Sequence, residues 1–589
     1  MSYLLKTCRI LALSVLLWHM TANAEVSSTR SAASTELFDV FPRDKAWPSK
    51  DTWGLFNGLL NGTLLSTVPI AAPCYGNWES YNRGRCERIG KSFTDPYFFF
   101  TSSENDQNSI MFPLFQGGTC LPIDNPNGYC AIGGYPVYTV NVSTVAQIQL
   151  AVNFARNANL RLVVKNTGHC YLGKSSGAGA LSVWTHNLKD IRHIEKYEAG
   201  AYQGKAMNIG ACVTVGEVYS AAHEARVTAV GGNCESVGYA GGYIAGGGHS
   251  PLSNLHGMAA DHVLALELMT ASGQFITASS TSNPELFWAL RGGGGSTFGI
   301  VTSIIIRVHR RLPVTTSFFS FSTSEKISED IFWAGVRAYF GMFIPFTYAG
   351  TSSYSWIYRN KNKASYTFEM KPFFAPNHLL TEFAPLTKTL FDQLTRLGIS
   401  PLRQTWHDEH VGTWTSRSGN RLFPRSSWED PVKFNKTFEM LRRHSEKGYM
   451  FGGYHMAPNN NPFNVDNAVN PAFRNAIAFL VTMTSWATNS TESQIKEISE
   501  NFTNEVMKLW RDIAPVSEGG GSYLNEAVVN EPEWQESFYG SNYKRLGEIK
   551  RKWDPEGVFY ATTGVGSEDW DLRNEDQVVT TQNGRLCHV

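Results

Sequence analysis

The sequence predicts an α+β protein with two or more domains, and three observations support this. The chain has 589 residues, too many for one hydrophobic core. Between about residues 137 and 277, short apolar runs alternate with segments of helical periodicity. From about Pro313, alternating stretches such as Tyr354–Tyr358 and Ala364–Phe368 predict a broad antiparallel sheet, and helical segments near 386–397 and 491–511 would cover one face.

The composition is that of a globular protein and excludes several classes of partner. Hydrophobic residues make up 42% and charged residues 17%, which is no signature of disorder. The 51 basic residues balance 51 acidic ones, so the net charge gives no reason to expect a nucleic acid or an acidic membrane as partner.

The first 24 residues have the features of a cleaved signal peptide. Lys6 and Arg9 are basic, Ile10–Trp18 is apolar but too short to span a bilayer, and Ala22–Ala24 is a small-x-small cleavage site. A short anchor helix is the less favoured alternative. No later apolar run is long enough for a membrane span, so we expect a protein of the secretory pathway, extracellular or vesicular, with no membrane partner after signal removal.

Cysteines and glycosylation triplets fit that compartment. Cys74/Cys86 and Cys120/Cys130 are close pairs in loop-like sequence and are plausible local disulfides, although spacing alone does not fix the connectivity. No two cysteines have CxxC spacing, so we expect no metal site. Candidate N-glycosylation triplets begin at Asn61, Asn141, Asn435, Asn489 and Asn501.

Regular structure is expected to begin after an irregular N-terminal extension, residues 25 to about 130. Ser143-Thr144 can cap a helix in which Val145, Ile148, Val152 and Ala155 recur at helical spacing. The elements expected after it are strands near 160–164, 181–184 and 207–215, a helix at 218–225, a strand at 227–230, and a strand pair, 263–270 and 274–277.

One short stretch after the strand at 160–164 has several possible functions. Lys165–Ser176 reads KNTGHCYLGKSS, which could cradle phosphate, bind metal, anchor a cofactor covalently or form an ordinary loop. Gly168–Ser175 satisfies the P-loop pattern, but a P-loop runs directly into a helix. Residues 176–180, SGAGA, are poor helix sequence and precede a strand, so the P-loop interpretation is disfavoured.

Two further glycine clusters favour a nucleotide-cofactor site. Gly231–Gly248 has eight glycines in eighteen positions, and Arg291–Ser296 reads RGGGGS. One such cluster would favour a flexible loop, but three that bound predicted strands favour backbone that closely approaches a flat or phosphorylated ligand. The GxGxxG dinucleotide pattern at a first strand is absent.

These motifs resemble those of the berberine-bridge-enzyme-like flavoproteins of the vanillyl-alcohol oxidase superfamily, of fungal type. The stretch at Lys165–His169 is similar to the family's Arg-x-Gly-Gly-His motif, and the other two clusters are similar to its Cys-x-x-Val-Gly and Leu-Arg-Gly-Gly-Gly segments. Tyr539–Leu546 and Lys552–Phe559 resemble its C-terminal signature. The resemblance spans roughly residues 130 to 565.

The resemblance implies FAD attached by two covalent bonds. His169 would bond the 8α-methyl of the flavin, Cys234 would bond its 6-position, and backbone N–H groups before His169 would hold the pyrophosphate. Lys165, Thr167 and Tyr243 depart from the family's usual Arg, Gly and His. The cofactor-binding residues implied in this way are His169, Cys234, Asn166, Thr167, Gly168, Val237, Gly238, Gly241, Gly242, Tyr243, Ile300, Asn542 and Tyr543.

The same resemblance implies hydride transfer from a small organic substrate. Tyr523–Glu526 resembles the family's Tyr-x-Asn-Tyr segment, so Tyr523 and Glu526 are the candidate catalytic residues, with Glu526 as base or only as a hydrogen-bonding group. Val237 stands where Val accompanies reaction with oxygen, which favours an oxidase producing hydrogen peroxide. The alternatives are a dehydrogenase, an oxidative cyclase in secondary metabolism and a non-catalytic flavin-binding protein.

The expected architecture is a two-part FAD-binding domain of the vanillyl-alcohol oxidase type plus a substrate domain. The predicted divisions are a signal peptide at 1–24, an extension at 25–130, the FAD-binding domain at 131–313, the substrate domain at 314–520 and a C-terminal segment at 521–589 that completes the FAD site.

Overall fold

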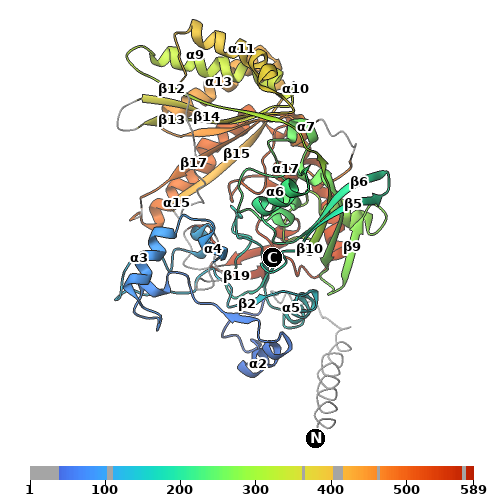
Figure 1. The fold of residues 1–589 in the computed structure, drawn as a ribbon. Helices are drawn as coiled ribbons and strands as arrows, with labels where there is room; N and C mark the ends of the chain where they lie inside the picture. Colours follow the sequence, from blue (N-terminus) through green and yellow to red (C-terminus); the bar gives the residue numbers. More distant parts are fainter. Residues whose placement is uncertain are drawn as a thin grey trace.

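The computed structural model describes residues 39–101, 111–360, 365–401, 415–459, 465–487, 489–573 and 579–589. The signal peptide predicted at 1–24 lies outside the described residues. The α+β prediction is confirmed: helices and three main sheets are distributed along the whole described chain (Figure 1). The division into domains stays a prediction, although the third sheet begins at Val314, the first residue of the predicted substrate domain.

The first sheet carries the strand that leads into the Lys165–Ser176 stretch. Its order is β1-β2-β4-β3, with β4 parallel to both of its neighbours. The strands are β1 (Leu64–Ser66), β2 (Tyr138–Asn141), β3 (Leu162–Lys165) and β4 (Leu181–Trp184). Because β1 comes from the predicted N-terminal extension, that segment contributes a strand to this sheet.

Helix α5 (Val145–Asn157) confirms the helix predicted after Ser143-Thr144. Thr144 and Gln147 form a capping box that satisfies N–H groups of its first turn. Ile148 and Val152 are buried on the side that packs in a core with β3 and β4. The periodicity in the sequence therefore identified the face that is buried.

The second sheet has five antiparallel strands in the order β5-β6-β10-β8-β9. They are β5 (Ile191–Ala199), β6 (Tyr202–Gly210), β8 (Val263–Met269), β9 (Phe275–Ser279) and β10 (Ile300–Arg307). The strand predicted at 207–215 is wrong at its end, because β6 ends at Gly210. Thr214 and Glu217 form a capping box that starts helix α6 (Val215–Glu224) instead.

The third sheet is the broad antiparallel sheet that the alternating sequence predicted. Its order is β12-β14-β13-β16-β17-β15. The strands are β12 (Val314–Ser322), β13 (Ser352–Asn360), β14 (Ser365–Pro376), β15 (Ser416–Pro424), β16 (Phe451–His455) and β17 (Ala476–Ser485).

Helices cover one face of this sheet and leave the other to the rest of the molecule. They include α9 (Glu329–Gly341), α11 (Leu380–Arg396), α13 (Pro431–Glu446) and α16 (Met507–Ile513). Figure 1 shows α9, α11 and α13 gathered on the outer side of the strands. Along β13, Ile357 packs in the core with these helices, whereas Tyr354 and Trp356 face a cavity on the opposite side.

The C-terminal segment connects the third sheet to the glycine clusters. Gly521 forms a bridge with Leu422 of β15, and Arg421 contacts Glu531 in a buried ion pair of 3.4 Å. Helices α17 (Trp534–Tyr539) and α18 (Tyr543–Trp553) follow. Leu546 of α18 lies against Gly293, so the segment packs on the third glycine cluster.

Both predicted disulfides are present. Cys74 bonds Cys86 and Cys120 bonds Cys130. Cys170, Cys212, Cys234 and Cys587 carry no disulfide. Within the described ranges, no helix combines the length and apolarity needed to cross a bilayer.

A cluster of three histidines, of which His262 is buried and His256 and His309 are half-buried, is expected to make the fold sensitive to acid. His262 and His309 share a hydrogen bond of 2.9 Å between their Nε2 atoms, and His256 stacks on His309. Burial lowers the pKa of both His256 and His262 to about 4. In the unfolded chain these rings bind protons near pH 6.5, so stability is fully present above that pH and is lost as the pH falls toward 4.

Each such histidine steepens the pH dependence of the unfolding free energy by up to about 1.4 kcal/mol per pH unit in this window. Denaturant unfolding at pH 7, 6 and 5 measures the slope. H309Q removes one titrating ring and should make the slope shallower. An unchanged slope would show that the cluster does not control acid stability.

Candidate active site

A cavity of about 1380 Å³ lies between the glycine clusters and the face of the third sheet opposite α9, α11 and α13. It is larger than the roughly 300–1,000 Å³ of ordinary ligand pockets, so it has room for a cofactor and a substrate together. Most of the predicted site residues line it: Asn166, Thr167, Gly168, His169, Cys234, Val237, Gly238, Gly241, Gly242, Tyr243, Ile300, Tyr523 and Glu526.

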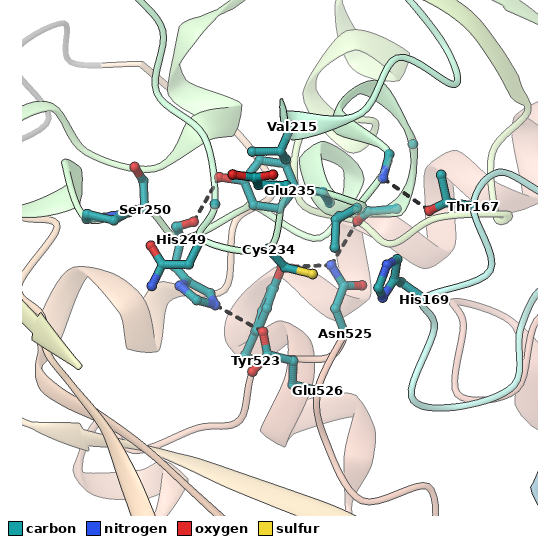
Figure 2. A pocket seen from close by; sticks show the side chains of 18 of the residues that line it. Thr167, His169, Val215, Cys234, Glu235, His249, Ser250, Tyr523, Asn525 and Glu526 are labelled. Atoms are coloured by element: carbon teal, nitrogen blue, oxygen red, sulfur yellow. Dashed lines mark hydrogen bonds and ion pairs between the residues drawn. The ribbon is translucent and has the colours of Figure 1, made fainter. Parts of the chain in front are cut away.

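His169 and Cys234, the two predicted covalent handles, lie beside one hydroxyl. Ser236 Oγ is 2.8 Å from His169 Nε2 and 3.4 Å from Cys234 Sγ. Figure 2 shows the imidazole and the thiol in the same part of the cavity. Burial lowers the pKa of His169 to about 4, so its imidazole is neutral at ordinary pH and keeps a lone pair for bonding.

The side chain of Asn166 explains two glycines of the second cluster. A Cβ at Gly238 would lie 1.8 Å from Asn166 Oδ1, and one at Gly241 would lie 2.7 Å from Asn166 Nδ2. The Thr167 hydroxyl accepts a hydrogen bond of 3.1 Å from the Gly238 N–H. Thr167, which departs from the family's glycine, therefore holds the two loops together (Figure 2).

Gly242 is different, because a Cβ added there would meet nothing within 4 Å. Its carbonyl accepts a hydrogen bond of 2.8 Å from Asn525, which also donates to the Tyr523 hydroxyl. The C-terminal segment is thus fastened to the second glycine cluster beside open cavity space. The nearby Asn166 Oδ1 is a buried acceptor with no partner among the described residues, which leaves it available to a ligand.

Glu526 forms a pair that sequence reasoning missed. Its Oε1 lies 3.0 Å from His249 Nε2, and both side chains line the cavity (Figure 2). His249 follows the glycine triplet that ends the second cluster, and its ring contacts Tyr454 and Tyr523 at centroid distances of 5.2 and 5.3 Å. The sequence separation of 277 between His249 and Glu526 means that no local motif contains both residues.

Tyrosines surround the carboxylate. Burial, followed by the charge of Glu526, raises the pKa of Tyr171, Tyr354 and Tyr523. These phenols therefore stay protonated at neutral pH and act as hydrogen-bond donors rather than bases. The Tyr243 hydroxyl donates to the His249 carbonyl at 2.8 Å. The residue that replaces the family's usual His therefore holds the backbone of His249, whose side chain pairs with Glu526.

Two predicted cofactor residues lie away from the cavity. Asn542 Nδ2 donates to the Val469 carbonyl at 3.1 Å, and the Tyr543 hydroxyl contacts the Glu568 carboxylate. Neither residue lines the cavity. Their positions at the start of α18 stabilise the turn that packs against the third glycine cluster, and their role as direct cofactor ligands stays a prediction.

Comparison with known proteins identifies the same family that the sequence motifs resemble. Residues 136–279 match the family described as "FAD binding domain", and residues 522–566 match "Berberine and berberine like". The chain is 36% identical over 564 residues to FAD-linked oxidoreductase ZEB1 of Gibberella zeae, covering 93% of this chain and 94% of that protein. It is 35% identical over 571 residues to VAO-type flavoprotein oxidase VAO615 of Thermothelomyces thermophilus, covering 93% and 95%.

A solved structure agrees with these matches. The crystal structure of the VAO-type flavoprotein MtVAO615 from Myceliophthora thermophila C1 superposes with a TM-score of 0.85 at 33% identity, covering 94% of this chain and all of that one. FAD fits the donors and acceptors of the cavity: a neutral His and a thiol near one hydroxyl suit the 8α-methyl and the 6-position, which belong to the same benzene ring of the flavin, and the open space at Gly242 admits a flat group. The chain belongs to the berberine-bridge-enzyme-like, vanillyl-alcohol-oxidase-type family of FAD-linked oxidoreductases.

Proposed function

We propose that the protein is a secreted oxidase that takes a hydride and a proton from a small organic substrate and passes both electrons to oxygen, yielding hydrogen peroxide. The observation that carries this proposal is the Glu526–His249 pair, which opens on the same cavity as His169 and Cys234. FAD, when bound, supplies the hydride acceptor. His169 and Cys234 would both hold it covalently.

Glu526 would take the proton from a substrate hydroxyl or amine. The hydrogen bond from His249 orients the carboxylate, and a positioned carboxylate can act as the general base that hydride removal requires. Protonated Tyr171, Tyr354 and Tyr454 around it would donate hydrogen bonds to the substrate and exclude water. His249 is therefore a positioning residue, and Glu526 is the candidate base.

The substrate part of the cavity is aromatic. Tyr354 and Tyr454 stack with centroids 4.7 Å apart, and Trp356 and Phe374 also line the cavity. Such walls favour a substrate with a flat or apolar body and one hydroxyl or amine directed at Glu526. Alcohols, carbohydrates and secondary-metabolite intermediates, including alkaloids, are the classes to test.

Anaerobic mixing of the purified protein with these classes tests the function directly. A substrate should bleach the flavin, and air should restore the colour with release of hydrogen peroxide. Bleaching with no peroxide in air would indicate a dehydrogenase. A flavin that no substrate bleaches would indicate a flavin-binding protein without turnover.

Val237 is expected to control the reaction with oxygen. It lines the cavity at the end of the turn that starts at Cys234, where Val237 N–H donates to the Cys234 carbonyl. One extra methylene can fill the small space that oxygen needs, so V237L should slow reoxidation by on the order of tenfold. Stopped-flow mixing of the reduced enzyme with oxygen measures this step. Reoxidation of the wild type no faster than that of free flavin would contradict an oxidase, and V237L should leave flavin reduction unchanged.

Secretion is part of the proposal, and two features support it. The disulfides Cys74–Cys86 and Cys120–Cys130 need an oxidising compartment. Four of the five glycosylation triplets begin at exposed asparagines: Asn61, Asn435, Asn489 and Asn501. Asn141 lies half-buried in β2 and is the least accessible acceptor.

A further inference from the structure

Two polar side chains beside the cavity have no use in the chemistry described above. Lys174 and Ser175 line the cavity, and each is only 7% exposed. Lys174 Nζ and Ser175 Oγ are buried atoms without a hydrogen-bond partner among the described residues. They follow Gly173, which has a φ of +72° and whose Cβ would collide with the ring of Phe115. The turn that presents them is therefore fixed by packing.

An unpaired buried ammonium is unstable unless an anion joins it. Burial lowers the pKa of Lys174, and the Cys170 thiol only partly opposes that shift. A ligand with negative oxygens would supply the missing partner for the lysine and an acceptor for the serine hydroxyl. The ammonium of Lys174 and the neighbouring Ser175 hydroxyl can both donate to one ligand, which suits an oxyanion better than a neutral ring.

The anion is not expected to be a substrate group at Glu526. The charge of Glu526 acts on the pKa of Tyr171, whereas the charge that acts on Lys174 comes from Cys170. Gly173 packs on Phe115 and the Ser176 hydroxyl donates to the Gly134 carbonyl, so Lys174 and Ser175, which lie between them, are on the part of the loop held by the N-terminal residues.

We propose that Lys174 and Ser175 form an anion subsite for the pyrophosphate of FAD, with Lys174 Nζ and Ser175 Oγ donating to its oxygens. This subsite adds a side-chain cation to the backbone N–H groups expected before His169. The assignment rests on the FAD of the proposed function but not on the substrate or on oxygen.

Comparing FAD with riboflavin tests the subsite, because riboflavin has the same ring and no phosphate. The background is H169A/C234A, in which flavin binds reversibly, and binding is followed by titration calorimetry. K174M should weaken FAD binding roughly 10- to 100-fold and leave riboflavin binding unchanged, as expected for loss of a charge-assisted contact. K174R keeps the charge and should stay within a few-fold, and S175A should have a smaller effect than K174M.

Equal weakening of FAD and riboflavin, or no weakening of FAD, would overturn the subsite. If H169A/C234A fails to fold, ³¹P NMR of the covalent holoprotein tests the subsite instead. K174M should shift the pyrophosphate resonances, and K174R should shift them less. Unshifted resonances in K174M would also overturn it. A wild-type protein purified without FAD would instead overturn the proposed function, which separates the two failures.

Discussion

Replacing both His169 and Cys234 by alanine is expected to release all of the flavin when the protein is denatured and precipitated in acid. In the wild type the yellow colour should stay with the pellet, because a covalent bond survives denaturation. Each single substitution should keep the colour in the pellet through the remaining bond. The geometric reason is that both side chains lie within contact of Ser236, so one ring can reach both.

The control is C170S, because Cys170 is the free thiol next to His169 in the chain. It should keep both bonds, and mass spectrometry of flavin peptides should find them only at His169 and Cys234. A pellet from H169A/C234A that stays yellow would show that the attachment assignment is wrong. A colourless pellet from either single variant would show one bond rather than two.

Replacing Glu526 by glutamine is expected to slow flavin reduction by roughly a hundred- to ten-thousand-fold, the usual range for loss of a general base. Glutamine keeps the size of the side chain and can still bond His249, but it cannot take a proton. Anaerobic single-turnover mixing with a saturating substrate measures the step directly. E536Q, an exposed carboxylate in the same C-terminal segment, serves as the matched control and should react at the wild-type rate.

His249 separates a catalytic role of Glu526 from a structural one. H249Q should slow flavin reduction less than E526Q does, because the carboxylate remains but loses its orienting partner. The pH profile of the reduction rate should also change in H249Q. An unchanged single-turnover rate in E526Q would exclude the base, and the carboxylate would then be only a hydrogen-bonding group.

Local signals predicted the elements that have strong caps or continuous apolar runs. The capping box at Thr144 and the run Leu181–Trp184 gave α5 and β4 with little error. Local signals do not predict which strands pair. For example, β10 lies between β6 and β8, strands that are distant from it in the sequence. The glycine-rich sequence before Ile300 also hid the start of that strand.

The glycine-rich motifs predicted His169 and Cys234 as site residues, and both line one cavity, while their bonds to the flavin stay a prediction. The same motifs did not predict the pair of Glu526 with His249. His249 has no motif spacing to Glu526, and only the fold brings the two together. For Asn542 the motif alone leaves the role open: its amide donates to the Val469 carbonyl, and its role as a cofactor ligand stays a prediction.

The attachment of the C-terminal segment by Asn525 to the Gly242 carbonyl has a consequence for biosynthesis. His169 and Cys234 leave the ribosome hundreds of residues before Asn525 and Glu526 do. A nascent chain halted before residue 521 would therefore have both proposed covalent handles but only part of the cavity wall, since Tyr523, Asn525 and Glu526 line it. If the proposed attachment and secretion hold, we expect incorporation of the cofactor to be completed only once the chain has been released, when free flavin would have to be present in the secretory pathway.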